Sequence, residues 1–186
     1  MERYENTLGI VIKSQDRRES DLAVTILTPN LGKITVTAKG AKNIKSSRLG
    51  SLQLGNVIKA HLYKKGDYLW LSESTTVSQF LQQPKHLTQI NLLFYFLEIL
   101  NAFIADNQQI PGVYQISEKI IKAITENQLA QFISYEIEFI DILGFGLPQN
   151  ILDTFKQKDY TSCQKLIRQH LESIIEKPLQ SSKMFS

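Results

Sequence analysis

Residues 21–40 read DLAVTILTPNLGKITVTAKG. Two runs rich in β-branched residues, at 21–28 and 32–40, flank the turn signal PNLG at 29–32. In the second run apolar and polar side chains alternate, which is typical of a strand with one buried face. This stretch therefore predicts two strands joined by a turn.

Similar strand signals occur on both sides of this stretch. LGIVIKS precedes it at 8–14, and NVIKAHLYKK and DYLWLSES follow it at 56–65 and 67–74. Five short strands within about 75 residues leave no room for crossover helices, so they predict a small antiparallel barrel or sandwich. A five-stranded barrel of the OB type fits the count, although SH3-like barrels use similar numbers.

The hydrophobic period changes near Pro84, and the rest of the chain is predicted to be helical. Four segments carry helical patterns, at 86–106, 116–127, 129–146 and about 162–176. The third ends at a glycine pair, Gly144 and Gly146, a common helix C-terminus. The sequence thus predicts an α+β protein, with an N-terminal five-stranded OB-type β-barrel over residues 1–80 and an all-α helical domain over 81–186.

Charge is distributed unevenly over a chain whose formal net charge is only +3. Residues 22–66 contain eight Lys and Arg residues and no Asp or Glu. Such a segment indicates contact with a polyanion, whereas the alternative is an ordinary solvated loop. The candidate DNA-binding residues are Lys39, Lys42, Lys45 and Arg48, together with Lys33 and Lys59.

Aromatic residues lie near these cations in the sequence. Tyr63, Tyr68 and Trp70 are candidates for stacking on nucleic-acid bases. Alternation places Tyr68 and Trp70 on one face of their strand, which is either the outer face or part of the barrel core.

The sequence carries no recognisable catalytic motif. The chain contains no phosphate-binding GxxxxGK[ST] or GxGxxG motif. Its three histidines are scattered, and the lone Cys163 cannot form a cysteine-rich zinc site. We therefore expect a protein that is not an enzyme and that uses no cofactor and no metal.

The first residues, MERYENTLG, lack the apolar core of a signal peptide. The single cysteine argues for a reducing compartment. The sequence predicts a cytoplasmic protein.

Residues 9–74 resemble the N-terminal domain of the RecO family of bacterial recombination mediators. AKGA at 38–41, the basic residues after it and RLGSLQ at 48–53 are the most specific part of the resemblance, and the GIV and LTPNLGK segments support it. In the second half, YEIEFIDILGFG at 135–146 resembles the family's helix that ends in an LGY-like turn. The resemblance covers about 145 residues and weakens after Pro148.

The resemblance implies an OB-fold domain followed by a helical domain. It also implies binding of single- and double-stranded DNA, annealing of complementary strands, and help in loading the RecA strand-exchange protein onto DNA coated by single-strand-binding protein. RecR and the acidic carboxy-terminal tail of single-strand-binding protein are the implied partners. The implied location is the bacterial cytoplasm, with nucleoid association during repair.

The chain departs from many family members at 144–164, where only Cys163 stands in place of a four-cysteine zinc site. For the acidic tail, Lys165 and Arg168 on the last predicted helix are the candidate cations. Two other functions stay open on the residues alone: an RNA-binding accessory factor with an OB fold, and a non-catalytic adaptor for an acidic protein.

Overall fold

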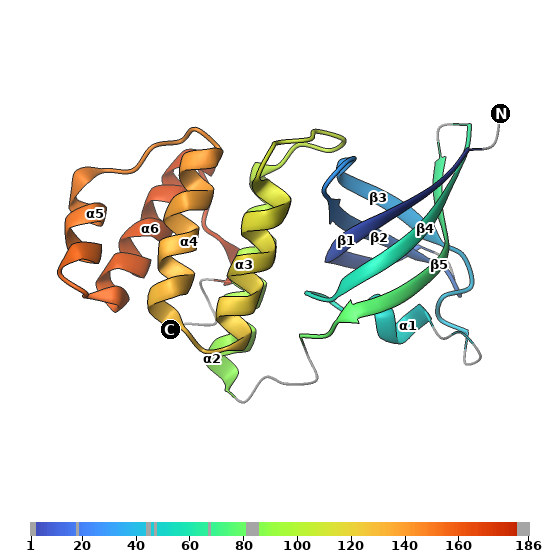
Figure 1. Cartoon of the computed structure of the whole chain (residues 1–186), viewed down its shortest axis with the longest axis horizontal. Coiled ribbons are helices and arrows are strands. Elements are labelled where there is room, and N and C mark those ends of the chain that lie inside the picture. The colour runs from blue at the N-terminus through green and yellow to red at the C-terminus, as the bar shows by residue number, and fades with distance from the viewer. Residues whose placement is uncertain are drawn as a thin grey trace.

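The computed structural model describes residues 3–17, 19–43, 46, 48–66, 68–80 and 86–181. Figure 1 shows a β-barrel beside a bundle of helices. In the described part of the chain, no helix has both the length and the apolar character that crossing a bilayer requires.

Five strands close into a barrel in the spatial order β1-β2-β3-β5-β4. Neighbouring strands pair antiparallel, except that β3 meets β5 in parallel through Thr37 and Trp70. The predicted OB-type barrel is confirmed, with the strand bounds β1 Arg3–Asp16, β2 Leu22–Thr28, β3 Gly32–Ala38, β4 Val57–Lys65 and β5 Tyr68–Ser78. A short helix, α1 (Arg48–Ser51), lies between β3 and β4.

The barrel wall buries apolar side chains on both of its faces. The inner face forms a compact cluster that includes Val24, Ile26, Ile34, Val36, Ile58, Leu62 and Leu71. On the outer face, Ile10, Ile12, Leu27 and Val57 join a second cluster that runs through the helices. The outer face of the barrel and the helices therefore share one hydrophobic core, which is distinct from the cluster inside the barrel.

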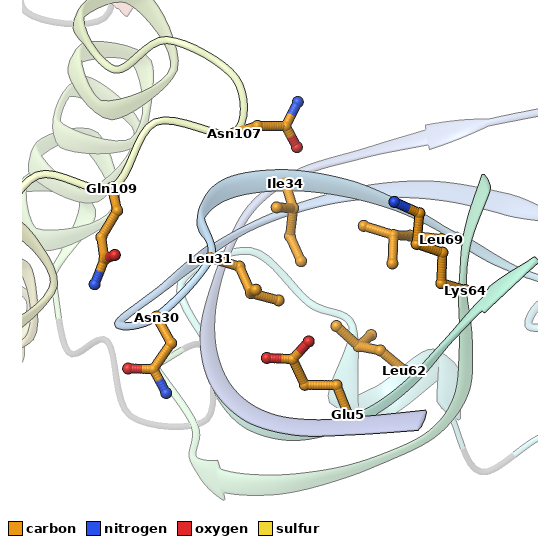
Figure 2. A pocket seen from close by; sticks show the side chains of 9 residues that line it. All are labelled: Glu5, Asn30, Leu31, Ile34, Leu62, Lys64, Leu69, Asn107 and Gln109. Atoms are coloured by element: carbon orange, nitrogen blue, oxygen red, sulfur yellow. The ribbon is translucent and has the colours of Figure 1, made fainter. Parts of the chain in front are cut away.

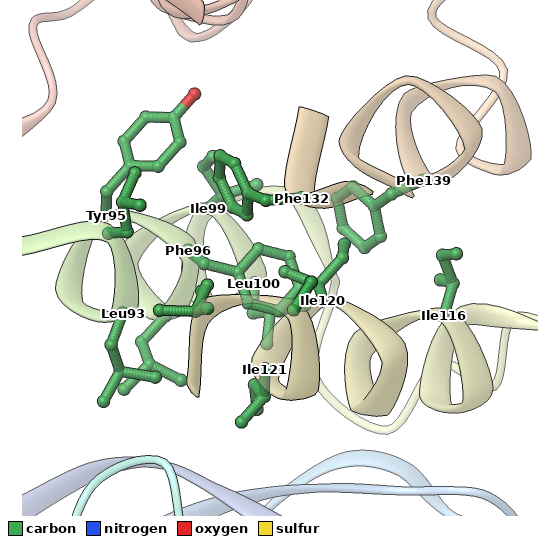
Figure 3. Close-up of a cluster of buried hydrophobic side chains, with 14 of the residues drawn as sticks. Leu93, Tyr95, Phe96, Ile99, Leu100, Ile116, Ile120, Ile121, Phe132 and Phe139 are labelled. Carbon is green, nitrogen blue, oxygen red and sulfur yellow. The ribbon is translucent and has the colours of Figure 1, made fainter. Parts of the chain in front are cut away.

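In the part of the chain that the structure describes, five helices follow the barrel: α2 Leu87–Phe103, α3 Val113–Thr125, α4 Leu129–Ile142, α5 Gln149–Lys156 and α6 Tyr160–Ile175. Helix α2 is apolar nearly all round and occupies the centre of the bundle, where Phe96 meets Phe139 edge to face at 5.6 Å (Figure 3). The four predicted helices are confirmed. Helix α5 was not predicted, because eight residues carry too few turns for a clear period.

A polar contact holds the loop between α2 and α3 against the barrel. The ammonium of Lys33 on β3 lies 3.1 Å from the Asp106 carboxylate and donates to the Asn101 carbonyl at 2.9 Å. The backbone N–H of Asn107 donates to the Lys33 carbonyl at 2.7 Å. Gly32 lies directly under this loop at φ +68°, and a Cβ there would come within 2.0 Å of the Gln108 carbonyl oxygen.

Gly32→Ala is expected to lower the free energy of unfolding by roughly 3 to 5 kcal/mol. The alanine would be strained at positive φ, and its Cβ would also clash with the backbone of the loop between α2 and α3. Gly66→Ala is the matched control, since Gly66 also has positive φ but no atom within 4 Å of an added Cβ. It should cost only about 1 to 2 kcal/mol. Equal losses in urea unfolding would contradict this account of the junction.

A carboxyl group is buried in the centre of the helical bundle. Glu136 on α4 is fully buried, and burial raises its pKa to about 8, although Tyr95 and Arg168 nearby act to lower it. The Arg168 guanidinium lies 4.8 Å from the centre of the Tyr95 ring. Glu136 is therefore largely protonated in the folded protein at neutral pH.

Unfolding returns Glu136 to its ordinary pKa near 4.5. Between these two values the folded state holds one more proton than the unfolded state, so stability falls as pH rises from about 4.5 to about 8. Glu136→Gln should remove this loss, which is on the order of 3 kcal/mol at pH 7. Urea unfolding at pH 5 and pH 8 measures it, and parallel pH profiles of variant and parent would exclude the assignment.

Candidate nucleic-acid interface

Alternation along β5 turns Leu69 and Leu71 toward the inside of the barrel, so Tyr68 and Trp70 face outward. Tyr68 is 59% exposed and Trp70 is partly exposed. The prediction that these two residues share a face is confirmed, and that face is the outer surface of the barrel.

Three aromatic side chains from three strands form a row across this surface. Tyr63 on β4 stacks on Trp70 at 6.1 Å between ring centres with an interplanar angle of 14°, and Tyr4 on β1 follows at 6.0 Å from Tyr63. The register places Tyr4 opposite Tyr63 and Tyr63 opposite Trp70. We call Tyr4, Tyr63 and Trp70 the aromatic row. Exposed ring faces of this kind can stack on bases of any sequence.

A hollow of about 280 Å³ continues the aromatic row toward β3. We call it the basic pocket, and it is lined by Arg17, Asp21, Thr37, Lys39, Tyr68 and Trp70. The guanidinium of Arg17 donates to the Thr37 hydroxyl, and the Asp21 carboxylate accepts from the Gly40 backbone N–H at 2.8 Å. These bonds fasten the β1–β2 turn to the segment after β3, so two loops present their cations beside Trp70.

The predicted DNA-binding cations fall into different environments. Lys39 is exposed and lines the basic pocket, and Lys59 is exposed on the outer face of β4. Lys42 is paired with Asp16 at 2.9 Å. Lys45 lies outside the described residues.

Two of the predicted cations make contacts within the protein that hold its elements together. Lys33 is 6% exposed and its ammonium is held at the junction with the helices, so it is not presented to a phosphate. Arg48 donates to the carbonyls of Leu71, Ser72 and Lys39 at 3.1, 3.2 and 2.7 Å. Arg48 thus holds α1 and the end of β3 against β5.

The candidate tail-binding cations are not equivalent either. Lys165 on α6 is exposed, whereas Arg168 is partly buried over the Tyr95 ring. A groove of about 300 Å³ between α4 and α5 carries the acids Glu138 and Asp141 beside Ile137 and Leu152. Its charge is unfavourable for an acidic tail.

Sequence reasoning missed Tyr4, Arg17 and Asp21. The predicted first strand began at Leu8, because RYEN lacks an apolar alternation, and Arg17 lies in a charged turn. Tyr4 could have been found from its four-residue spacing from Leu8, because residues four apart lie on the same face of an extended strand.

Among the described residues, no three His, Cys, Asp or Glu side chains gather at metal-binding distances. Cys163 is buried on α6 with its sulfur 3.6 Å from the Ile151 carbonyl, and burial raises its pKa to about 11. It is a thiol that packs in the core.

The fold and the surface define a class of protein: a five-stranded OB-type barrel, with an aromatic and basic outer surface, joined to a helical bundle. Residues 1–80 match the family model described as "Recombination protein O N terminal". The chain is similar to the RecO family over this N-terminal part and, at 25% to 29% identity, over most of its length.

Three curated relatives illustrate the similarity, and each is a DNA repair protein RecO. The protein of Thermoanaerobacter sp. (strain X514) is 25% identical over 150 residues, covering 79% of this chain and 60% of the relative. That of Acetivibrio thermocellus is 27% identical over 146 residues, covering 77% and 58%. That of Clostridium kluyveri is 29% identical over 174 residues, covering 90% and 66%. The aligned part of the chain thus spans about six tenths of the length of these relatives.

Proposed function

We propose that this chain is a DNA repair protein whose barrel binds single-stranded DNA along the aromatic row and the basic pocket. The observation that carries the proposal is the continuity of the two features through Trp70, with stackable rings on one side and Lys39 and Arg17 on the other. Names of relatives support the repair role. Stacking and phosphate contacts are both tolerant of sequence, as a general strand-binding surface requires.

Strand annealing is the activity that this surface suits. Two complementary strands repel each other through their phosphates, and cations that neutralise them need no catalytic residue. We propose that the chain also contacts double-stranded DNA, anneals complementary strands and helps to load the RecA strand-exchange protein onto DNA coated by single-strand-binding protein. An annealing assay with complementary oligonucleotides tests the central step, and absence of acceleration at saturating protein would reject it.

Variants of exposed residues test the surface without disturbing the fold. Tyr4 is 72% exposed and Tyr68 is 59% exposed. Tyr4→Ala and Tyr68→Ala should each weaken single-stranded DNA binding by about fivefold or more, which corresponds to the smaller of the typical losses when one base no longer stacks on an aromatic side chain. Lys39→Ala should flatten the slope of log affinity against log salt by about 0.7. Fluorescence anisotropy at several salt concentrations measures both effects.

The controls separate binding from folding. Leu87→Ala and Lys122→Ala alter exposed residues of the helices and should leave affinity and slope unchanged. Arg48→Ala removes three bonds to carbonyls and should lower stability by about 2 kcal/mol. Unchanged DNA binding in all three surface variants would reject the interface, and tighter binding of structured RNA than of DNA would favour the RNA-binding alternative.

For partners we propose RecR and the acidic tail of single-strand-binding protein, with Lys165 as an exposed cation for the tail. Arg168 is excluded from this proposal because its guanidinium lies over Tyr95. Lys165→Ala should weaken binding of a labelled acidic tail peptide by a few fold, the size of an exposed ion pair. Lys177→Ala, at another exposed lysine, is the control, and equal effects of the two variants would reject a specific role for Lys165.

A further inference from the structure

A second cavity, of about 400 Å³, opens at the end of the barrel where β1 begins and β4 meets β5. It is lined by Glu5, Asn30, Leu31, Ile34, Leu62, Lys64, Leu69, Asn107 and Gln109, which Figure 2 draws around one hollow. The barrel supplies most of the wall, and the loop between α2 and α3 supplies Asn107 and Gln109. Its volume lies in the range of small-molecule sites.

The walls of this cavity are apolar and its rim is polar. Ile34 and Leu62 are buried on the inner face of the barrel, and Leu31 and Leu69 are partly buried beside them. The carboxamides of Asn30, Asn107 and Gln109 stand at the rim (Figure 2). A flat ring that lies against leucine side chains and offers hydrogen-bonding groups at its edge matches this lining.

Two opposite charges face the cavity without neutralising each other. The Glu5 carboxylate points toward Leu31 and Leu62 in Figure 2, and Lys64 extends from β4 on the far side. Within the described part of the chain, neither side chain makes a hydrogen bond or an ion pair. A ligand that donates N–H groups at one end and carries negative charge at the other satisfies both.

The rim is held in place by the contact between the barrel and the helices. Asn107 donates its backbone N–H to the Lys33 carbonyl at 2.7 Å, and the Gln109 side-chain nitrogen donates to the Pro29 carbonyl at 2.9 Å. That bond orients the Gln109 amide and leaves its oxygen as an acceptor. Lys33 therefore contributes to the cavity by positioning Asp106 and the residues after it.

The cavity and the aromatic row share one hairpin. Lys64 and Leu69 face the cavity, while their neighbours Tyr63 and Trp70 belong to the aromatic row on the other side of the same two strands. A DNA strand stacked on the aromatic row would thus lie on the opposite side of the β4–β5 hairpin from the cavity.

We propose that the cavity accepts one unstacked nucleobase of the bound strand, with Glu5 accepting from an exocyclic amino group and Lys64 facing the phosphate. This inference rests on the proposed function. Carboxylates accept from cytosine N4, whereas thymine offers no amino group, so the site prefers cytosine over thymine. An acidic peptide would bring its carboxylates against Glu5, and a basic one would leave Lys64 without a partner.

The test compares anisotropy of labelled dC and dT homopolymers of 15 residues at pH 8, with the full chain. The parent should bind the dC strand roughly fivefold more tightly than the dT strand, which corresponds to the smaller of the typical discriminations from one base contact. Glu5→Gln should reduce this ratio to near one. Glu73→Gln removes the same charge from an exposed position of the barrel outside the cavity and should keep the ratio.

A titration with dCMP and dTMP, followed by NMR of the leucine methyl groups, gives an independent readout. The signals of Leu31 and Leu69 should shift with dCMP in the parent and much less in Glu5→Gln. A ratio near one in the parent, with DNA binding intact, would overturn the base site and leave the proposed function standing. If neither strand binds, the proposed function fails, and the dCMP titration alone then tests whether the cavity binds a base. Methyl shifts with an acidic peptide but not with dCMP would overturn the proposed base site.

Discussion

The structure depends on a barrel wall that carries apolar side chains on its inner face and on the part of its outer face that meets the helices. Ile10, Ile12, Leu27 and Val57 would lie in water if the barrel stood alone, so covering them favours attachment of the helices. Leu93 on α2 packs so closely that a Cβ on Gly55 would come within 2.8 Å of it. The position of the helices then brings the loop between α2 and α3 over the end of the barrel, where it completes a cavity.

Cations from one acid-free segment serve separate purposes because their surroundings differ. Lys33 and Arg48 bond to backbone carbonyls and hold elements together, and Lys42 pairs with Asp16. Lys39 stays in solvent beside Trp70. Only some cations of a basic stretch can therefore reach a phosphate, since a cation that is buried, or whose guanidinium bonds to several backbone carbonyls, is not available to a ligand.

The β4–β5 hairpin links the two candidate sites. Its outward residues join the aromatic row and its inward residues line the cavity at the barrel end, so one layer of backbone separates the proposed stacking surface from the proposed base site. Residues 81–186 contain most of the Asp and Glu residues, and no Lys or Arg lies between Lys122 and Lys156. This asymmetry supports the proposal that DNA binds to the barrel rather than to the helices.

The amino-acid sequence by itself determined the five strands, the four longer helices, the fact that Tyr68 and Trp70 share one face of their strand, and the basic character of residues 22–66. These features follow from local periodicity and composition, which act over a few neighbouring residues. Only the tertiary structure decided that Tyr4 joins Tyr63 and Trp70, that Lys33 is buried, and that Glu5, Lys64 and Asn107 meet. Strand register and packing between distant segments set these contacts, and no local pattern encodes which residues lie opposite one another.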